Sequence, residues 1–139
     1  IYIWPIFLTW PIITVLSATF VFAQETEHTQ GYIVLTRNIQ QLKPIILAAK
    51  QLTEEDKANQ NVFEIVICGK AVNDLQNDSV IQPLLEFAAK SNVKILACGF
   101  SLQKFKIDST KLPEKVGVVE NGILYNFQRE KQGALSIEL

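Results

Sequence analysis

From residue 31 onward, short apolar, β-branched runs alternate with longer amphipathic segments. The short runs are typical of β-strands and predict strands at 31–36, 63–68, 93–98, 116–120 and 134–139. The longer segments repeat apolar residues at helical spacing, which predicts helices over about 43–56, 79–90 and 122–132. Strands that alternate with helices indicate parallel pairing through crossover connections. The pattern therefore predicts one α/β domain over residues 31–139, a three-layer α/β/α sandwich with a mostly parallel sheet of about five strands.

Local signals predict where the helices begin and end. Pro44 suits the first turn of a helix that begins just before it. Ser79 and Gln82 have the spacing of a capping box at the start of the second helix. Asn121 is the expected N-cap of the third helix, and Gly133 follows the end of that helix.

An apolar segment without charged residues, residues 1–23, precedes this domain. Its uninterrupted part, 12–22, has the length of a signal-peptide hydrophobic region, and small residues stand at the cleavage positions. We predict a signal peptide cleaved after Ala23, a linker at 24–30, and an exported, periplasmic protein. The alternative is an uncleaved N-terminal membrane anchor, because the whole segment is nearly long enough to cross a bilayer.

Composition and charge narrow the function classes. The 13 basic and 14 acidic residues leave a net charge of −1, which predicts neither nucleic-acid binding nor a polybasic membrane contact. The only histidine, His28, lies in a polar connecting stretch, so neither a Ser-His-Asp triad nor a histidine-based metal site is expected. We predict no metal and no cofactor. Two cysteines outside a C-x-x-C pair are too few for a disulfide scaffold.

The candidate chemistry lies at these two cysteines, Cys68 and Cys98, each at the end of an apolar strand. Both strands are nearly continuous apolar runs, so helices are expected on both faces of the sheet. Ligands of open parallel sheets bind outside the carboxyl ends of the strands, so both thiols are expected at one functional edge. Helix starts at that edge lower the pKa of a thiol and favour the nucleophilic thiolate. The expected neighbours are Lys70, Gly99, Phe100, Ser101, Lys104, Glu120 and Asn121.

The residues alone leave three interpretations of the cysteines open. Free cysteine often behaves as a small buried hydrophobe, so both are candidates for plain core positions. A Cys68–Cys98 disulfide is favoured by export and requires Cα atoms within about 7 Å. The third interpretation is a reactive thiol at Cys98, where Gly99 permits a close approach, Ser101 supplies a hydrogen bond and Lys104 adds positive charge.

Three motifs occur in a fixed order along residues 31–139. They are Gly-x-Ala-Val at 69–72, Ala-Cys-Gly-x-Ser at 97–101, and Val-Val-x-x-Gly at 118–122 with Gly133 before the last strand. In this order the domain resembles the DsrE/DsrF-like (YchN-like) family, small α/β proteins linked to sulfur oxidation and sulfur relay. The signal-like N-terminus places the resemblance with an exported branch.

The resemblance implies that Cys98 accepts a sulfane sulfur, holds it as a persulfide and passes it to the thiol of a partner. It also implies a homotrimer or homohexamer, and a sulfur donor or acceptor protein as partner. The segment at 98–106, "CGFSLQKFK", lacks the paired arginines that follow this cysteine in the best-studied carriers. The alternatives are a non-catalytic module that binds a small ligand or partner protein, with structural cysteines, and a thiol redox protein that uses Cys68 and Cys98.

Overall fold

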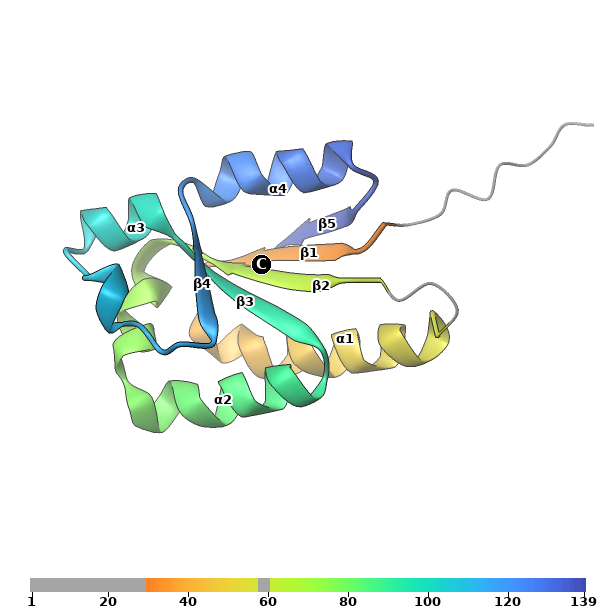
Figure 1. Ribbon diagram of the computed structural model, residues 1–139, viewed down its shortest axis with the longest axis horizontal. Helices are drawn as coiled ribbons and strands as arrows, with labels where there is room; N and C mark the ends of the chain where they lie inside the picture. Colours follow the sequence, from red (N-terminus) through yellow and green to blue (C-terminus); the bar gives the residue numbers. More distant parts are fainter. Residues whose placement is uncertain (1–29, 58–60) are drawn as a thin grey trace, which may run out of the picture.

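The computed structural model describes residues 30–57 and 61–139, which form a five-stranded sheet with helices on both faces (Figure 1). The strand order is β4-β3-β2-β1-β5, and every neighbouring pair is parallel. The prediction of a three-layer α/β/α sandwich is therefore confirmed. The strands are β1 (Tyr32–Thr36), β2 (Phe63–Ile67), β3 (Val93–Cys98), β4 (Val116–Val119) and β5 (Leu135–Glu138).

Two long helices, α1 and α2, cover one face of the sheet, and α4 covers the other (Figure 1). A short helix, α3, follows β3 at the carboxyl end of the sheet. The helices are α1 (Leu42–Glu55), α2 (Asp78–Lys90), α3 (Gly99–Lys104) and α4 (Gly122–Lys131). Three 3₁₀ segments are η1 (Ile39–Gln41), η2 (Gly69–Gln76) and η3 (Ser109–Lys111).

The helix ends confirm the signals at Asn121 and Gly133 and contradict the signal at Ser79. Asn121 is the N-cap of α4, and its side chain accepts hydrogen bonds from two backbone N–H groups of the first turn. Gly133 lies just past α4 with a φ of +90°, a conformation that glycine adopts without a steric cost. The capping box at Ser79 is wrong: α2 begins one residue earlier, after Asn77, and the Ser79 hydroxyl donates a hydrogen bond to Asn77 Oδ1.

The two faces of the sheet carry cores of unequal size. The large core lies under α1 and α2, and β2 is buried at all five positions, as expected for a strand covered on both faces. In β3, however, Lys94 is exposed and Leu96 is half-buried, because only α4 packs on the second face. Complete coverage of β3 is therefore a wrong expectation. The small core on the α4 face consists of Ile33, Leu35, Val66, Cys68, Cys98 and Ala134.

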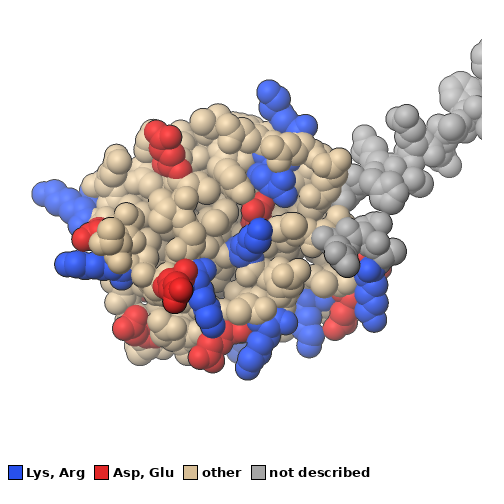
Figure 2. Space-filling model, in the orientation of Figure 1, with Lys and Arg blue, Asp and Glu red and all other residues tan. Residues whose placement is uncertain are grey.

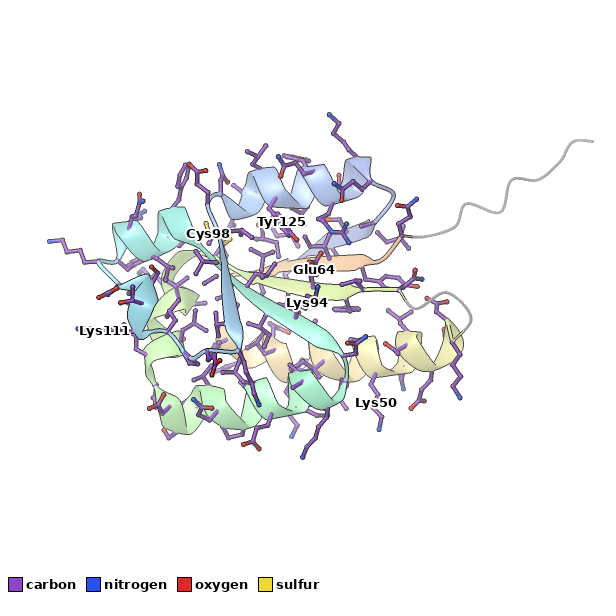
Figure 3. All side chains as sticks on the ribbon, in the orientation of Figure 1. Lys50, Glu64, Lys94, Cys98, Lys111 and Tyr125 are labelled. Carbon is purple, nitrogen blue, oxygen red and sulfur yellow. The ribbon has the colours of Figure 1, made fainter. Side chains whose placement is uncertain are left out.

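A buried ion pair holds α4 on this face. The carboxylate of Glu64, in β2, accepts hydrogen bonds from the Tyr125 hydroxyl at 2.8 Å and from Arg129 Nε at 2.6 Å. Both partners belong to α4, and Figure 3 shows Tyr125 and Glu64 between that helix and the sheet. The pattern of β2 predicts an apolar strand, so a buried carboxylate was not expected there. This contact fixes the helix whose first turn reaches the two cysteines.

The N-terminal predictions fall on residues that the structure does not describe. These are the signal peptide or anchor at 1–23, the linker at 24–30 apart from Gln30, and His28. Export to the periplasm thus stays a prediction. Within the two described ranges, no helix combines the length and the apolar character that crossing a membrane requires.

Candidate functional site

The carboxyl ends of four strands surround one pocket with a volume of about 530 Å³. Arg37 follows β1, Cys68 follows β2, Cys98 ends β3 and Asn121 follows β4, and all four residues line the pocket. This is the edge at which open parallel sheets bind ligands. The rest of the wall is Gly69, Lys70, Phe100, Ser101, Lys104, Phe105 and Ile123.

The two cysteines lie side by side. In the parallel register of β2 and β3, Ile67 pairs with Ala97, so the next residues, Cys68 and Cys98, are neighbours. Their side chains are 6% and 5% exposed and belong to the same small core under α4. Both thiols are free in the structure, and the disulfide between them stays a prediction.

The sulfur of Cys98 accepts a hydrogen bond from the backbone at the start of α4. The N–H group of Gly122, at the start of α4, donates a hydrogen bond to Cys98 Sγ at 3.3 Å. Burial alone raises the pKa of this thiol, but hydrogen bonds from the Ser101 hydroxyl and from the N–H groups of Gly122 and Ser101 lower it below its ordinary value. The site therefore stabilises a thiolate at Cys98, which is the nucleophilic form.

Cys68 has the opposite environment, although it lies beside Cys98. Burial, followed by the charge of Cys98, raises the pKa of the Cys68 thiol to about 12. The pair therefore combines a thiol at Cys98 that ionises more readily than an ordinary cysteine with a thiol at Cys68 that stays protonated at neutral pH. Figure 3 shows Cys98 where α3 and the start of α4 come together.

Ser101 connects the loops that follow β2 and β3. Its Oγ accepts a hydrogen bond from the Gly69 N–H at 2.9 Å, and its own proton is then available for Cys98. Gly69 has a φ of +62°, a backbone conformation in which glycine avoids the strain of a side chain. The serine thus holds the two cysteine-bearing loops in a fixed relation.

Of the predicted binding residues, Lys70, Phe100, Ser101 and Asn121 line the pocket together with Cys98. Gly99 does not. It starts α3, where a Cβ would lie 3.0 Å from the carbonyl oxygen of Glu120 and 3.1 Å from that of Val119. Gly99 therefore allows the chain after β4 to approach α3 closely. Glu120, which was expected at this edge, is not a wall residue.

Sequence reasoning missed Arg37, Gly122 and Ile123. Arg37 directly follows a predicted strand, so the rule that placed the cysteines at the carboxyl edge applies to it as well. Gly122 belongs to a recognised motif, but its contact with Cys98 depends on how α4 crosses the sheet. In the described ranges, 30–57 and 61–139, no group of three or more His, Cys, Asp or Glu side chains is arranged to hold a metal ion.

Replacing Ser101 with alanine is expected to shift the alkylation of Cys98 to higher pH. The variant loses a hydrogen bond to the thiolate, so the pKa of Cys98 rises and the rate at neutral pH falls about tenfold. The rate of modification by iodoacetamide, followed by intact mass from pH 5 to 10, measures the shift in a Cys68→Ala background. Ser109→Ala, at an exposed position in η3, serves as the control. An unchanged midpoint in Ser101→Ala contradicts this role of the serine.

Two solved structures are similar to the chain over its described domain. One is a protein of unknown function, MTH1491 from Methanobacterium thermoautotrophicum, with a TM-score of 0.59 and 22% identity over 78% of this chain and 99% of that chain. The other is the ychN protein from E. coli, with a TM-score of 0.57 and 16% identity over 78% of this chain and 99% of that chain. This chain has the ychN fold.

The ychN fold confirms, at the level of architecture, the resemblance that the three motifs indicate. No family model matches the chain, and no curated protein matches it. At identities of 22% and 16%, the similarity establishes the arrangement of strands and helices. The activity has to be argued from the thiol pocket itself.

Proposed function

We propose that the chain is a DsrE/DsrF-like sulfur carrier that holds sulfane sulfur as a persulfide on Cys98. The observation that carries the proposal is the environment of Cys98, a thiol that ends a parallel strand, accepts a hydrogen bond from Gly122 and lines a pocket. The hydrogen bonds that lower its pKa favour the thiolate, which is the nucleophile in exchange at sulfur.

In the loading step, the Cys98 thiolate attacks the sulfane sulfur of a donor. A new S–S bond forms at Cys98, the S–S bond of the donor breaks, and the remaining donor anion leaves. Lys70 and Lys104 line the pocket and offer positive charge to an anionic donor or leaving group. The Ser101 and Gly122 groups that face the thiolate are equally suited to an anionic persulfide.

An acceptor thiol has to reach this pocket, and apolar side chains surround the approach. Phe100 and Ile123 line the pocket and are each 52% exposed, while Leu124 and Phe127 continue the apolar surface along α4. Figure 2 shows acidic and basic side chains interspersed in its lower part, where α1 and α2 lie, and fewer charged side chains over α4, whose basic residues Arg129 and Lys131 lie in its last turn. A patch of this kind is typical of a protein contact, so we assign the sulfur donor or acceptor protein to it.

The homotrimer or homohexamer implied by the resemblance is part of the same proposal. The supporting observation is a second apolar surface at the opposite edge of the sheet from β4. There β5 is an edge strand, and Leu135, Ile137 and Leu139 are 50–60% exposed. An apolar edge strand of this kind favours association with another chain.

The carrier proposal predicts that Cys68→Ser, which keeps Cys98 as its one thiol, gains the mass of a single sulfur atom. The fully reduced chain is treated with inorganic polysulfide, desalted and analysed by intact mass, and cyanide or dithiothreitol should remove the added sulfur. The gain should be absent in Cys98→Ser and in the variant with both substitutions. A folded Cys68→Ser variant that gains no sulfur contradicts the proposal.

A further inference from the structure

We propose that Cys68 resolves the persulfide on Cys98, so that the chain releases the sulfane sulfur as hydrogen sulfide and forms a Cys68–Cys98 disulfide. This second activity rests on the proposed persulfide at Cys98. It assigns a chemical role to Cys68, which directly precedes the Gly-x-Ala-Val motif at 69–72. That motif requires no thiol.

The first support is the position of the two residues in the sheet. They follow directly on the paired residues Ile67 and Ala97, and neighbouring strands lie about 4.8 Å apart. Disulfides form when Cα atoms are about 4.4–6.8 Å apart, so the backbone permits a bond between these positions. Both side chains also lie on the same face of the sheet, within one small core.

The second support is that the two side chains meet beneath the first residue of α4. A Cβ added to Gly122 would lie 2.6 Å from Cys68 Sγ and 3.3 Å from Cys98 Cβ. The absence of a side chain at Gly122 therefore leaves room for both thiols under the helix. A nucleophile held beside its target reacts at a high effective concentration, which accelerates the intramolecular step over attack by a free thiol.

The resolving step is balanced in atoms and electrons. The Cys68 proton passes to the outer sulfur of the persulfide, and the Cys68 thiolate then attacks Cys98 Sγ. The Cys68–Cys98 bond forms, the bond between Cys98 Sγ and the outer sulfur breaks, and hydrosulfide leaves. Over loading and resolution together, counted from the two free thiols and the sulfane sulfur of the donor, each cysteine sulfur is oxidised by one electron and the sulfane sulfur is reduced by two. Two equivalents of a low-molecular-weight thiol then restore both cysteines and become a disulfide themselves.

The difference in pKa between the two thiols determines which one reacts first. Cys68 is held protonated by its burial and by the neighbouring charge, so Cys98 is the first nucleophile toward the donor. When Cys98 carries sulfur, the negative charge lies on the outer atom, further from Cys68. Cys68 then donates its proton to this outer sulfur, which leaves as hydrosulfide.

The test compares the wild-type chain with Cys68→Ser after both have been loaded with polysulfide under reducing-agent-free conditions and desalted. Intact mass follows the persulfide over time, and sulfide in solution is quantified in parallel. We expect the wild-type persulfide to decay at least about tenfold faster than that of Cys68→Ser. The wild-type chain should end at a mass two hydrogens below that of the reduced chain, with one sulfide released per chain. Peptide mapping should locate the Cys68–Cys98 bond, and Cys68→Ala provides a second variant that lacks the thiol.

The outcomes separate this step from the carrier proposal. If the wild-type chain keeps its persulfide as long as Cys68→Ser does, the resolving role is wrong and the carrier role stands. Sulfide release without loss of two hydrogens also overturns it, because the sulfide then comes from another reaction. If Cys68→Ser gains no sulfur at all, the carrier proposal fails, and the resolving step fails with it.

Discussion

The variant Arg129→Met is expected to lower the free energy of unfolding by about 3 kcal/mol. Arg129 Nε lies 2.6 Å from Glu64 Oε2, and the two side chains are 17% and 7% exposed. Removal of the guanidinium leaves the Glu64 carboxylate buried with only the Tyr125 hydroxyl as partner. A buried charge without its counter-charge is strongly destabilising, because the protein interior solvates it poorly. Chemical denaturation followed by circular dichroism measures the loss.

Arg37→Met provides the matched control, because it removes the same type of side chain from an exposed ion pair. Arg37 Nη1 lies 2.9 Å from Glu138 Oε1, but both side chains are 58% exposed, so the expected loss is below about 1 kcal/mol. The double variant Glu64→Gln/Arg129→Met should be more stable than Arg129→Met, because it contains no unpaired buried charge. Equal losses in Arg37→Met and Arg129→Met contradict the anchoring role of the Glu64 pair.

The architecture was predictable because each element has a local signature. The β-branched runs at 63–67 and 93–98 and the helical spacing of Leu42, Ile45 and Ile46 each favour one type of element whatever surrounds them. The strand order was not predictable, since a buried parallel strand shows the same apolar pattern at any central position. The start of α2 was missed because Asn77 and Ser79 are both good N-cap residues, and the helix begins after Asn77 although the Asn77 side chain makes no cap hydrogen bond.

The site was predictable where it follows strand ends. Cys98, Ser101 and Asn121 could be assigned to one edge because parallel strands share the direction of their carboxyl ends. The relation of Cys68 to Cys98 required the pairing of β2 with β3, which local patterns do not encode. Likewise, Glu64 forms its ion pair with a residue 65 positions later, so its burial depends on how α4 returns across the sheet.

Gly122→Ala is expected to slow the loading of Cys98 with sulfur at least about tenfold while the fold is retained. The added methyl group would lie 2.6 Å from Cys68 Sγ and 2.9 Å from Val66 Cγ1, well inside the optimal separation of about 3.5–4.0 Å. Val66 is fully buried in β2, so the start of α4 has to move instead. That movement lengthens the hydrogen bond from the Gly122 N–H to Cys98 Sγ, so the thiolate form of Cys98 is less stabilised.

The rate at which polysulfide consumes the reduced chain, measured by intact mass, tests this effect against Gly117→Ala. A Cβ at Gly117 would meet Leu96 Cδ2 at 2.7 Å on the same face of the sheet, but neither cysteine lies within 4 Å of it. Leu96 is half-buried and its end is flexible, so loading should be nearly unchanged in this control. Cys68→Ala combined with Gly122→Ala should recover part of the loading rate, because the smaller side chain vacates the space that the new methyl group needs. Loading at the wild-type rate in Gly122→Ala would show that Cys98 does not depend on the first N–H of α4.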